Sequence, residues 1–280
     1  MRTLKDSSVQ LVVTSPPYPM IEMWDSLFGQ MNPQIAELLQ GATSSDGGAD
    51  DAVASAYELM HKSLAGVWRE CHRVLTDGGI ACINIGDATR TLNGKFRLFP
   101  NHATVIERCE EVGFVTLPFI VWKKPTNKPN AFLGSGFLPT NGYVTLDLEH
   151  ILIFRKGDIR RFPPKDTKRY SSSFTKAQRD VWFSQVWSVR GATQSLRMGR
   201  RRSAAFPDEI PNRLIRMFSV VGDTVLDPFL GTGTTMKVAG DLDRNSVGFE
   251  VDRAMGPTIC DKLGRPSATH SDGFEFKRRS

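Results

Sequence analysis

A short apolar stretch, Thr224-Val225-Leu226, runs directly into a loop with two glycines and then into a helix-forming segment. The loop reads Asp227-Pro228-Phe229-Leu230-Gly231-Thr232-Gly233-Thr234-Thr235. Glycine permits a tight turn and lets a ligand lie against bare backbone, while the N-terminus of a helix offers unpaired N–H groups. This strand–loop–helix unit constrains the fold, because such units build open α/β sheets that bind ligands at their carboxyl edge.

The rest of the chain alternates between strand and helix patterns. Helical spacing predicts helices over 51–75, 101–112 and 209–218 and from Thr234 onward, and apolar runs predict strands over 11–13, 80–85, 114–123, 151–154 and 246–249. Asp77-Gly78-Gly79 is interpreted as the stop signal of the first helix. Alternating strands and helices predict an α/β fold with a mainly parallel sheet covered on both faces.

The glycine loop narrows the class of ligand. The sequence contains no GxxxxGK[ST], which excludes an ordinary P-loop, and the third glycine of GxGxxG is replaced by other residues. Glu250 follows the next predicted strand, where an acid accepts ribose hydroxyls. A ligand with ribose and adenine but no pyrophosphate fits best, with Asp227, Pro228, Phe229, Gly231, Gly233, Thr234, Thr235 and Glu250 as predicted contacts. A glycine turn without a ligand is the open alternative.

A second motif, Thr14-Ser15-Pro16-Pro17-Tyr18, directly follows the strand Leu11-Val12-Val13. It should therefore lie at the carboxyl edge of the sheet. Two prolines fix the backbone and leave carbonyls free, so a carbonyl and the Ser15 hydroxyl can accept hydrogen bonds from an amino group. Tyr18 offers a face on which a planar base can stack. Taken alone, the motif is better interpreted as a proline-rich strand exit.

The stretch from Arg155 to Arg202 is strongly basic. It holds fourteen Lys or Arg against three Asp, while the whole chain has a formal net charge of only +6, so the remainder is net acidic. Aromatic residues interleave with the charges: Phe162, Tyr170, Phe174, Trp182, Phe183 and Trp187. A solvated charged face is one interpretation, but polyanion binding is favoured, with Arg197, Arg200, Arg201 and Arg202 as the predicted contacts with the polyanion.

Composition excludes several other classes. No apolar run is long enough to span a membrane, and no signal-peptide pattern opens the chain. The four cysteines form no CxxC pair and the five histidines form no visible ligand cluster, so neither disulfides nor a metal are predicted. These features favour an intracellular protein, with the bacterial cytoplasm as the default location.

Together the two motifs resemble the permuted (beta) group of amino-methylating DNA methyltransferases. In that group the catalytic motif comes first, a target-recognition region follows, and the cofactor loop comes last. The resemblance implies a Rossmann-like S-adenosylmethionine-dependent methyltransferase sheet with circularly permuted motif order and an inserted basic recognition region. It implies a catalytic half over 1–155, recognition over 156–202 and a cofactor-binding half over 203–280. The Gly-Asp pair that the family carries before its match to Met1–Leu4 is missing, so the acid that contacts adenine stays unassigned.

The same resemblance implies the chemistry. Ser15, Pro16, Pro17 and Tyr18 would form the catalytic segment and hold the amino group of a base flipped out of double-stranded DNA. Carbon-5 methylation is disfavoured because it needs a Pro-Cys nucleophile, which this sequence lacks. Ser in the first motif position resembles the cytosine-N4 members more than the adenine-N6 members. We therefore expect N4-cytosine methylation, with a cognate restriction enzyme as a further expected partner.

Several interpretations stay open at this point. The nearest is an adenine-N6 DNA methyltransferase, and an RNA or protein amide methyltransferase is more distant. A non-catalytic DNA-binding protein on the same fold is the alternative from another class. Trp122, in Val121-Trp122-Lys123-Lys124-Pro125, could stack on the base or pack in the core, and Asp87 could line the site. The sequence leaves the oligomeric state and the target sequence open.

Overall fold

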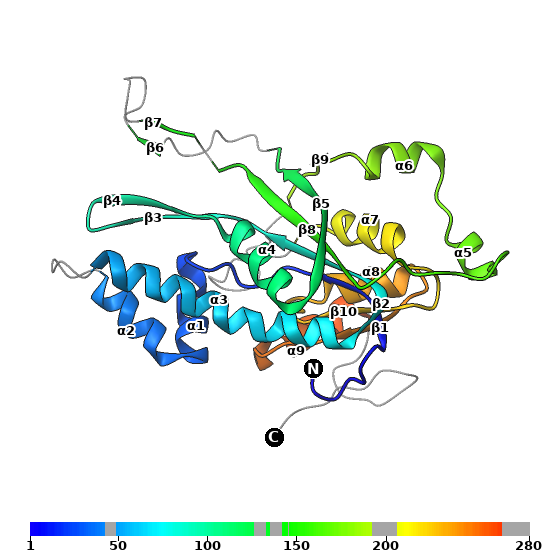
Figure 1. The fold of residues 1–280 in the computed structure, drawn as a ribbon, viewed down its shortest axis with the longest axis horizontal. Coiled ribbons are helices and arrows are strands. Elements are labelled where there is room, and N and C mark those ends of the chain that lie inside the picture. The colour runs from blue at the N-terminus through cyan, green and yellow to red at the C-terminus, as the bar shows by residue number, and fades with distance from the viewer. Residues whose placement is uncertain (43–48, 126–132, 135–141, 145, 192–205, 265–280) are drawn as a thin grey trace.

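The computed structural model describes residues 1–42, 49–125, 133–134, 142–144, 146–191 and 206–264. Its centre is a seven-stranded sheet in the order β11-β10-β1-β2-β8-β5-β9. The strands are β1 (Val9–Thr14), β2 (Leu75–Ile85), β5 (Phe114–Lys123), β8 (Leu148–Lys156), β9 (Val186–Ser188), β10 (Thr224–Asp227) and β11 (Asn245–Gly248). Only β8 runs antiparallel to its neighbours, β2 and β5, among these described strands. The predicted α/β fold with a mainly parallel sheet is confirmed (Figure 1).

Helices cover both faces of the sheet because side chains alternate along each strand. Val12 packs into a core with the first helices, whereas its neighbours Leu11 and Val13 pack into a second core. The first core involves α1 (Asp25–Met31), α2 (Pro33–Gly41), α3 (Ala49–Val74) and α4 (Asn101–Val112). The second involves α7 (Glu209–Phe218) and α8 (Thr234–Asp241). A third, smaller cluster packs α9 (Gly256–Lys262) against α8.

Helix α3 confirms the predicted amphipathic helix, since Met60, Leu64, Trp68 and Cys71 recur at helical spacing and are all buried. The predicted stop signal was wrong in detail. The helix ends at Val74 and β2 begins at once, so Asp77-Gly78-Gly79 lies inside the strand. The register against β1 shifts there, and Gly78 has a φ of +72°. These residues form an irregular bulge that only glycine tolerates easily.

Several elements were not predicted. The hairpin of β3 (Ala88–Leu92) and β4 (Lys95–Phe99) turns at Asn93-Gly94, where both residues have positive φ. The remaining short elements are η1 (Glu22–Trp24), β6 (Leu133–Gly134), β7 (Gly142–Tyr143), α5 (Thr167–Ser171), α6 (Lys176–Trp182) and η2 (Arg253–Met255). In Figure 1 the β3–β4 hairpin extends away from the sheet on one side, and α5 and α6 lie at the other.

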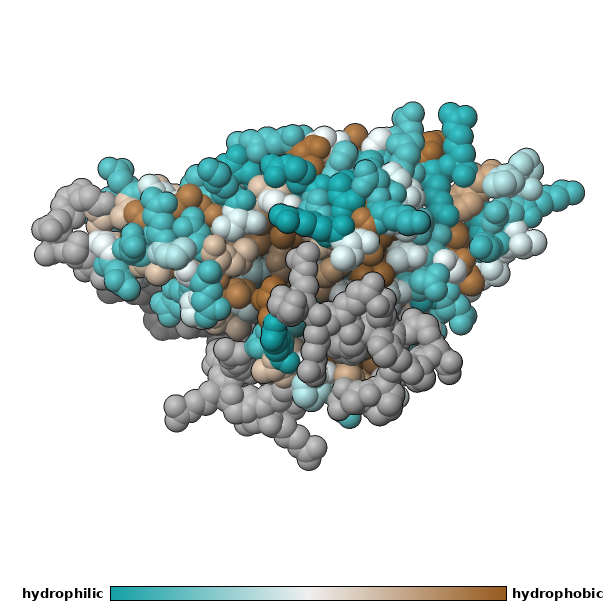
Figure 2. Space-filling model, turned by 90° about the horizontal axis from the view of Figure 1, so that it is seen from below, coloured by the Kyte–Doolittle hydropathy of each residue, from teal (hydrophilic) through white to brown (hydrophobic). Residues whose placement is uncertain are grey.

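The surface is mostly hydrophilic at its rim. Figure 2 shows hydrophilic side chains around the periphery of the lower face and hydrophobic ones nearer the middle. No helix among the described residues is long and apolar enough to cross a lipid bilayer.

Candidate active site

The two motifs meet because their strands are neighbours. β1 pairs in parallel with β10, so Leu11 lies opposite Val225 and Val12 opposite Leu226. Both strands therefore end at the same edge of the sheet. There Thr14 Oγ1 donates a 2.6 Å hydrogen bond to Asp227 Oδ1, although the two residues are 213 positions apart. The fold thus places the Ser-Pro-Pro-Tyr segment beside the glycine loop, as ligand-binding α/β sheets require.

The glycine loop has the geometry of a ligand cradle. Gly231 and Gly233 have φ of +53° and +88°, which side-chain-bearing residues rarely adopt, and Gly233 caps the N-terminus of α8. A Cβ added to Gly231 would meet only the carbonyl oxygen of Phe229, at 3.9 Å. Open space therefore lies beside bare backbone at the start of a helix. Bare backbone at a helix N-terminus is the kind of surface that a ligand can approach closely.

Two carboxylates hold the loop in place. Glu250 accepts hydrogen bonds from the N–H of Gly231 on one oxygen and of Asp252 on the other, both at 2.8 Å. Asp227 is buried and also accepts the N–H of Phe229 at 3.1 Å. Burial raises the pKa of Asp227 to about 6, while hydrogen bonds from Thr14, Thr235 and Phe229 oppose the rise. Phe229 packs edge-on against Trp68, with ring centroids 6.0 Å apart.

A hydrogen-bond network surrounds Tyr18. Its hydroxyl donates to Glu149 Oε2 at 3.0 Å and lies 3.1 Å from Ser15 Oγ. Asn84 Nδ2 donates both to the Tyr18 hydroxyl at 2.8 Å and to Glu149 Oε2 at 2.6 Å. Lys124 forms an ion pair with the other oxygen of Glu149. Pro16 and Pro17 are buried beneath, whereas Ser15 is partly exposed.

The topology explains why these side chains meet. β8 runs opposite to β2 and β5, so its first residues lie at the edge where β2 and β5 end. Glu149 is therefore placed beside Asn84 near the end of β2 and Lys124 just after β5. A cavity of about 280 Å³ opens here, lined by Tyr18, Ile21, Gly86, Asp87, Lys124, Leu146, Asp147, Leu148 and Glu149. Its volume lies near the lower end of small-molecule pockets.

Asp87 lines this cavity and is held by His102. Both of its carboxylate oxygens lie 2.8 Å from the ring atom His102 Nδ1, and the backbone N–H of His102 donates to Oδ1 at 3.1 Å. The His102 ring stacks on His150 with centroids 4.1 Å apart. Burial acts to raise the pKa of Asp87, but the hydrogen bonds from His102 outweigh it and lower the pKa. One ligand atom from each of Asp87, His102 and His150 lies within 4.8 Å of the others, a grouping the sequence did not reveal.

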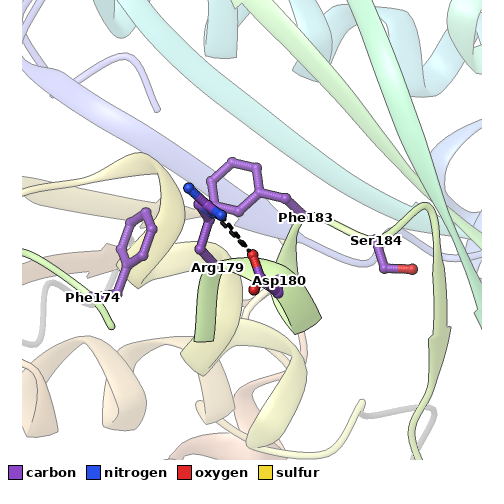
Figure 3. A pocket seen from close by; sticks show the side chains of 5 residues that line it. All are labelled: Phe174, Arg179, Asp180, Phe183 and Ser184. Atoms are coloured by element: carbon purple, nitrogen blue, oxygen red, sulfur yellow. Dashed lines mark hydrogen bonds and ion pairs between the residues drawn. The ribbon is translucent and has the colours of Figure 1, made fainter. Parts of the chain in front are cut away.

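The predicted recognition region divides into buried and exposed parts. Trp182 and Trp187 are buried, and β9 pairs with β5 at the edge of the sheet. Phe174 and Phe183 instead line an open hollow with Arg179, Asp180 and Ser184, and Arg179 pairs with Asp180 at 2.8 Å (Figure 3). Arg197, Arg200, Arg201 and Arg202 lie outside the described residues.

Trp122 takes the structural role that the sequence left open. Its side chain is only 2% exposed, and its Nε1 donates a 2.7 Å hydrogen bond to the carbonyl of Val189. A base cannot stack on a ring buried in this way. Its neighbour Lys124 instead reaches the cavity, with its ammonium 4.6 Å from the centre of the Trp122 ring.

Known proteins resemble this chain in sequence and in fold. The family model for DNA methylases of the N6/N4 type matches residues 9–257. The chain belongs to this family. The methylase is 59% identical to the type II methyltransferase M.MjaI of Methanocaldococcus jannaschii, covering 94% of this chain and 88% of that protein. It is 49% identical to the type II methyltransferase M.MthZI of Methanothermobacter thermautotrophicus, and the match covers 90% of this chain and 70% of that protein.

A solved structure shares the fold. A Thermus thermophilus protein, described as a DNA modification methylase and complexed with S-adenosyl-L-methionine, superposes with a TM-score of 0.69. It is 31% identical and covers 94% of the methylase and 91% of its own chain. The family and the methyltransferase fold expected from the sequence are therefore confirmed.

Sequence reasoning missed three residues of the cavity and its surroundings: Asn84, Lys124 and Glu149. A signal for Asn84 existed, since it interrupts the otherwise apolar run Ile83-Asn84-Ile85, and a polar residue in a buried strand needs a partner. Lys124 and Glu149 gave no such signal. They lie at the ends of strands whose pairing the sequence did not specify.

Proposed function

We propose that the methylase transfers a methyl group from S-adenosylmethionine to the N4 amino group of a cytosine flipped out of double-stranded DNA. The observation that carries this proposal is the Ser15 hydroxyl at the end of β1, held beside the cofactor loop by the Thr14–Asp227 hydrogen bond. A neutral hydroxyl and the Pro16 carbonyl can both accept from one amino group. Such contacts hold the amino group in place for direct attack.

Cytosine is favoured over adenine by the lining of the cavity. Next to its amino group and ring nitrogen, cytosine presents an oxygen, O2, where adenine presents a C–H. Lys124 lines the cavity, and its ammonium has three donors, of which the contact with Glu149 uses one. A donor suited to O2 is therefore at hand. Ser at position 15 supports the same choice through the resemblance to cytosine-N4 enzymes.

The cofactor is S-adenosylmethionine, and it supplies an activated methyl group when bound. We place it against Asp227, Pro228, Phe229, Gly231, Gly233, Thr234 and Thr235, with Glu250 accepting ribose hydroxyls. The residues of this chain bind the cofactor, orient the base and exclude water from the site. Extruding the base costs a few kcal/mol, and the ring of Tyr18 can offset part of this cost by stacking.

We propose further that residues 156–202 read the DNA, between a catalytic half over 1–155 and a cofactor-binding half over 203–280. Arg197, Arg200, Arg201 and Arg202 are the proposed contacts, because Arg suits both phosphates and guanine edges. The relatives in Methanocaldococcus and Methanothermobacter are named type II methyltransferases. A cognate restriction enzyme is accordingly the proposed partner.

The test incubates DNA with the methylase and S-adenosylmethionine, digests it to nucleosides and identifies the methylated base by mass. We expect N4-methylcytosine, and Ser15→Ala should reduce its formation strongly. N6-methyladenine as the product would overturn the cytosine assignment. Calorimetric binding of both cofactor and DNA without any methylation would instead favour a DNA-binding protein without catalysis.

A further inference from the structure

The hydrogen atoms around Tyr18 can be assigned from the chemistry of its neighbours. A phenol has one O–H to donate and lone pairs to accept. Its oxygen makes three contacts: 3.0 Å to Glu149 Oε2, 2.8 Å to Asn84 Nδ2 and 3.1 Å to Ser15 Oγ. A carboxylate can only accept, so the phenol proton points to Glu149.

The Asn84 amide is fixed in the same way. Its nitrogen lies 2.6 Å from Glu149 Oε2, and an amide oxygen in that position would face a carboxylate oxygen. The nitrogen therefore donates both to Glu149 and to Tyr18. The Tyr18 oxygen has its single proton committed, so the contact with Ser15 is one in which the Ser15 hydroxyl donates.

This assignment matters for the amino group that is to be methylated. A serine hydroxyl that is free to rotate can donate to the amino nitrogen and occupy the lone pair that must attack the methyl group. A hydroxyl whose proton is committed elsewhere can only accept. We propose that Glu149, acting through Tyr18, holds the Ser15 hydroxyl as a hydrogen-bond acceptor for the target amino group.

Tyr18 and Glu149 are then positioning residues, and this role rests on the proposed function of Ser15. Burial, followed by the charge of Glu149, raises the pKa of Tyr18 well above its usual value, so the phenol keeps its proton. Lys124 and Asn84 hold Glu149 from two sides. The role is separate from base stacking, because phenylalanine would keep the ring and lose only the hydroxyl.

The test is a double-mutant cycle of Tyr18→Phe and Ser15→Ala, with the single-turnover methylation rate as the readout. Tyr18→Phe should lower this rate about tenfold, the effect of one lost hydrogen bond of about 1.4 kcal/mol, with KM for DNA unchanged. In the Ser15→Ala background the same change should have no further effect, because Tyr18 acts through Ser15. Tyr57→Phe is the matched control: its hydroxyl contacts Thr104 at 2.9 Å and does not line the cavity, so its loss should leave the rate unchanged.

Glu149→Gln provides a second arm. A carboxamide that turns its NH2 toward Tyr18 reverses the hydrogen bond, so the rate should fall in the wild-type background and not in the Tyr18→Phe background. Calorimetric binding of S-adenosylmethionine checks that each variant is folded. Full activity of Tyr18→Phe, or single-variant losses that multiply in the double variant, would overturn the proposal. A wild-type product other than N4-methylcytosine would instead contradict the proposed function. The double-mutant cycle could then still be measured with the amino group that is methylated.

Discussion

Thr14 and Asp227 are joined by a buried 2.6 Å hydrogen bond that links the end of β1 to the end of β10. Thr14 is the first residue of the Thr14–Tyr18 motif, and Asp227 is the first residue of the glycine loop. The bond therefore sets the distance between the proposed base-binding segment and the proposed cofactor cradle.

Thr14→Val should destabilise the methylase by about 1–3 kcal/mol, because Asp227 loses a buried donor while the side-chain volume is kept. Urea denaturation followed by circular dichroism measures the free energy of unfolding. Thr14→Ser, which retains the hydroxyl, is the matched control and should lose less. Equal stability of Thr14→Val and wild type would show that the bond contributes nothing.

The raised pKa of Asp227 should make the stability of the methylase depend on pH. Its pKa is about 6 in the folded protein and near the ordinary 3.8 in the unfolded chain. Between these values the folded state binds a proton that the unfolded state does not, so at this site stability falls as the pH rises from about 4 to 6. Asn does not ionise, so Asp227→Asn does not lose this stability as the pH rises. The free energy of unfolding of the variant minus that of wild type should therefore increase by on the order of 3 kcal/mol between about pH 4 and 6. A difference that stays constant with pH would contradict this.

Glu250→Gln should weaken binding of S-adenosylmethionine about tenfold to a hundredfold, because ribose hydroxyls lose a charged acceptor. Isothermal titration calorimetry measures the change. Glu58→Gln, which alters an exposed carboxylate paired with Arg108, is the control and should bind the cofactor as wild type does. Unchanged affinity of Glu250→Gln would remove Glu250 from the cofactor site.

Replacing Arg200, Arg201 and Arg202 with Ala should weaken DNA binding and reduce its salt dependence. Each lost phosphate contact lowers the slope of log K against log salt by about 0.9. Fluorescence anisotropy between about 50 and 200 mM salt measures both effects. Lys5→Ala, at an exposed residue far in sequence from these arginines, is the control. An unaltered slope would place the DNA contacts elsewhere.

Local elements with strong periodicity could be predicted from the sequence. The helices over 101–112 and 209–218 and the strand over 114–123 agree with α4, α7 and β5. The β3–β4 hairpin was missed because its strands are short, although Asn93-Gly94 is a hairpin signal. The bulge at Gly78 was mistaken for a helix stop because a glycine pair signals both.

The cavity shows why part of the site could not be predicted. Ser15, Tyr18 and the glycine loop lie in contiguous motifs whose chemistry can be inferred from neighbouring residues. Glu149 joins Tyr18 across 131 positions and Asn84 across 65. Such partners depend on the order and direction of strands, above all on the reversed strand β8.

The sequence alone determined the class of this protein, because short motifs at strand ends carry their own backbone geometry and chemistry. It indicated an α/β methyltransferase sheet, a cofactor loop and an amino-binding Ser-Pro-Pro-Tyr segment. Only the tertiary structure decided how Ser15 is oriented. The direction of its hydroxyl proton is set by Tyr18, Asn84 and Glu149, and these side chains converge only when β1, β2 and β8 are paired.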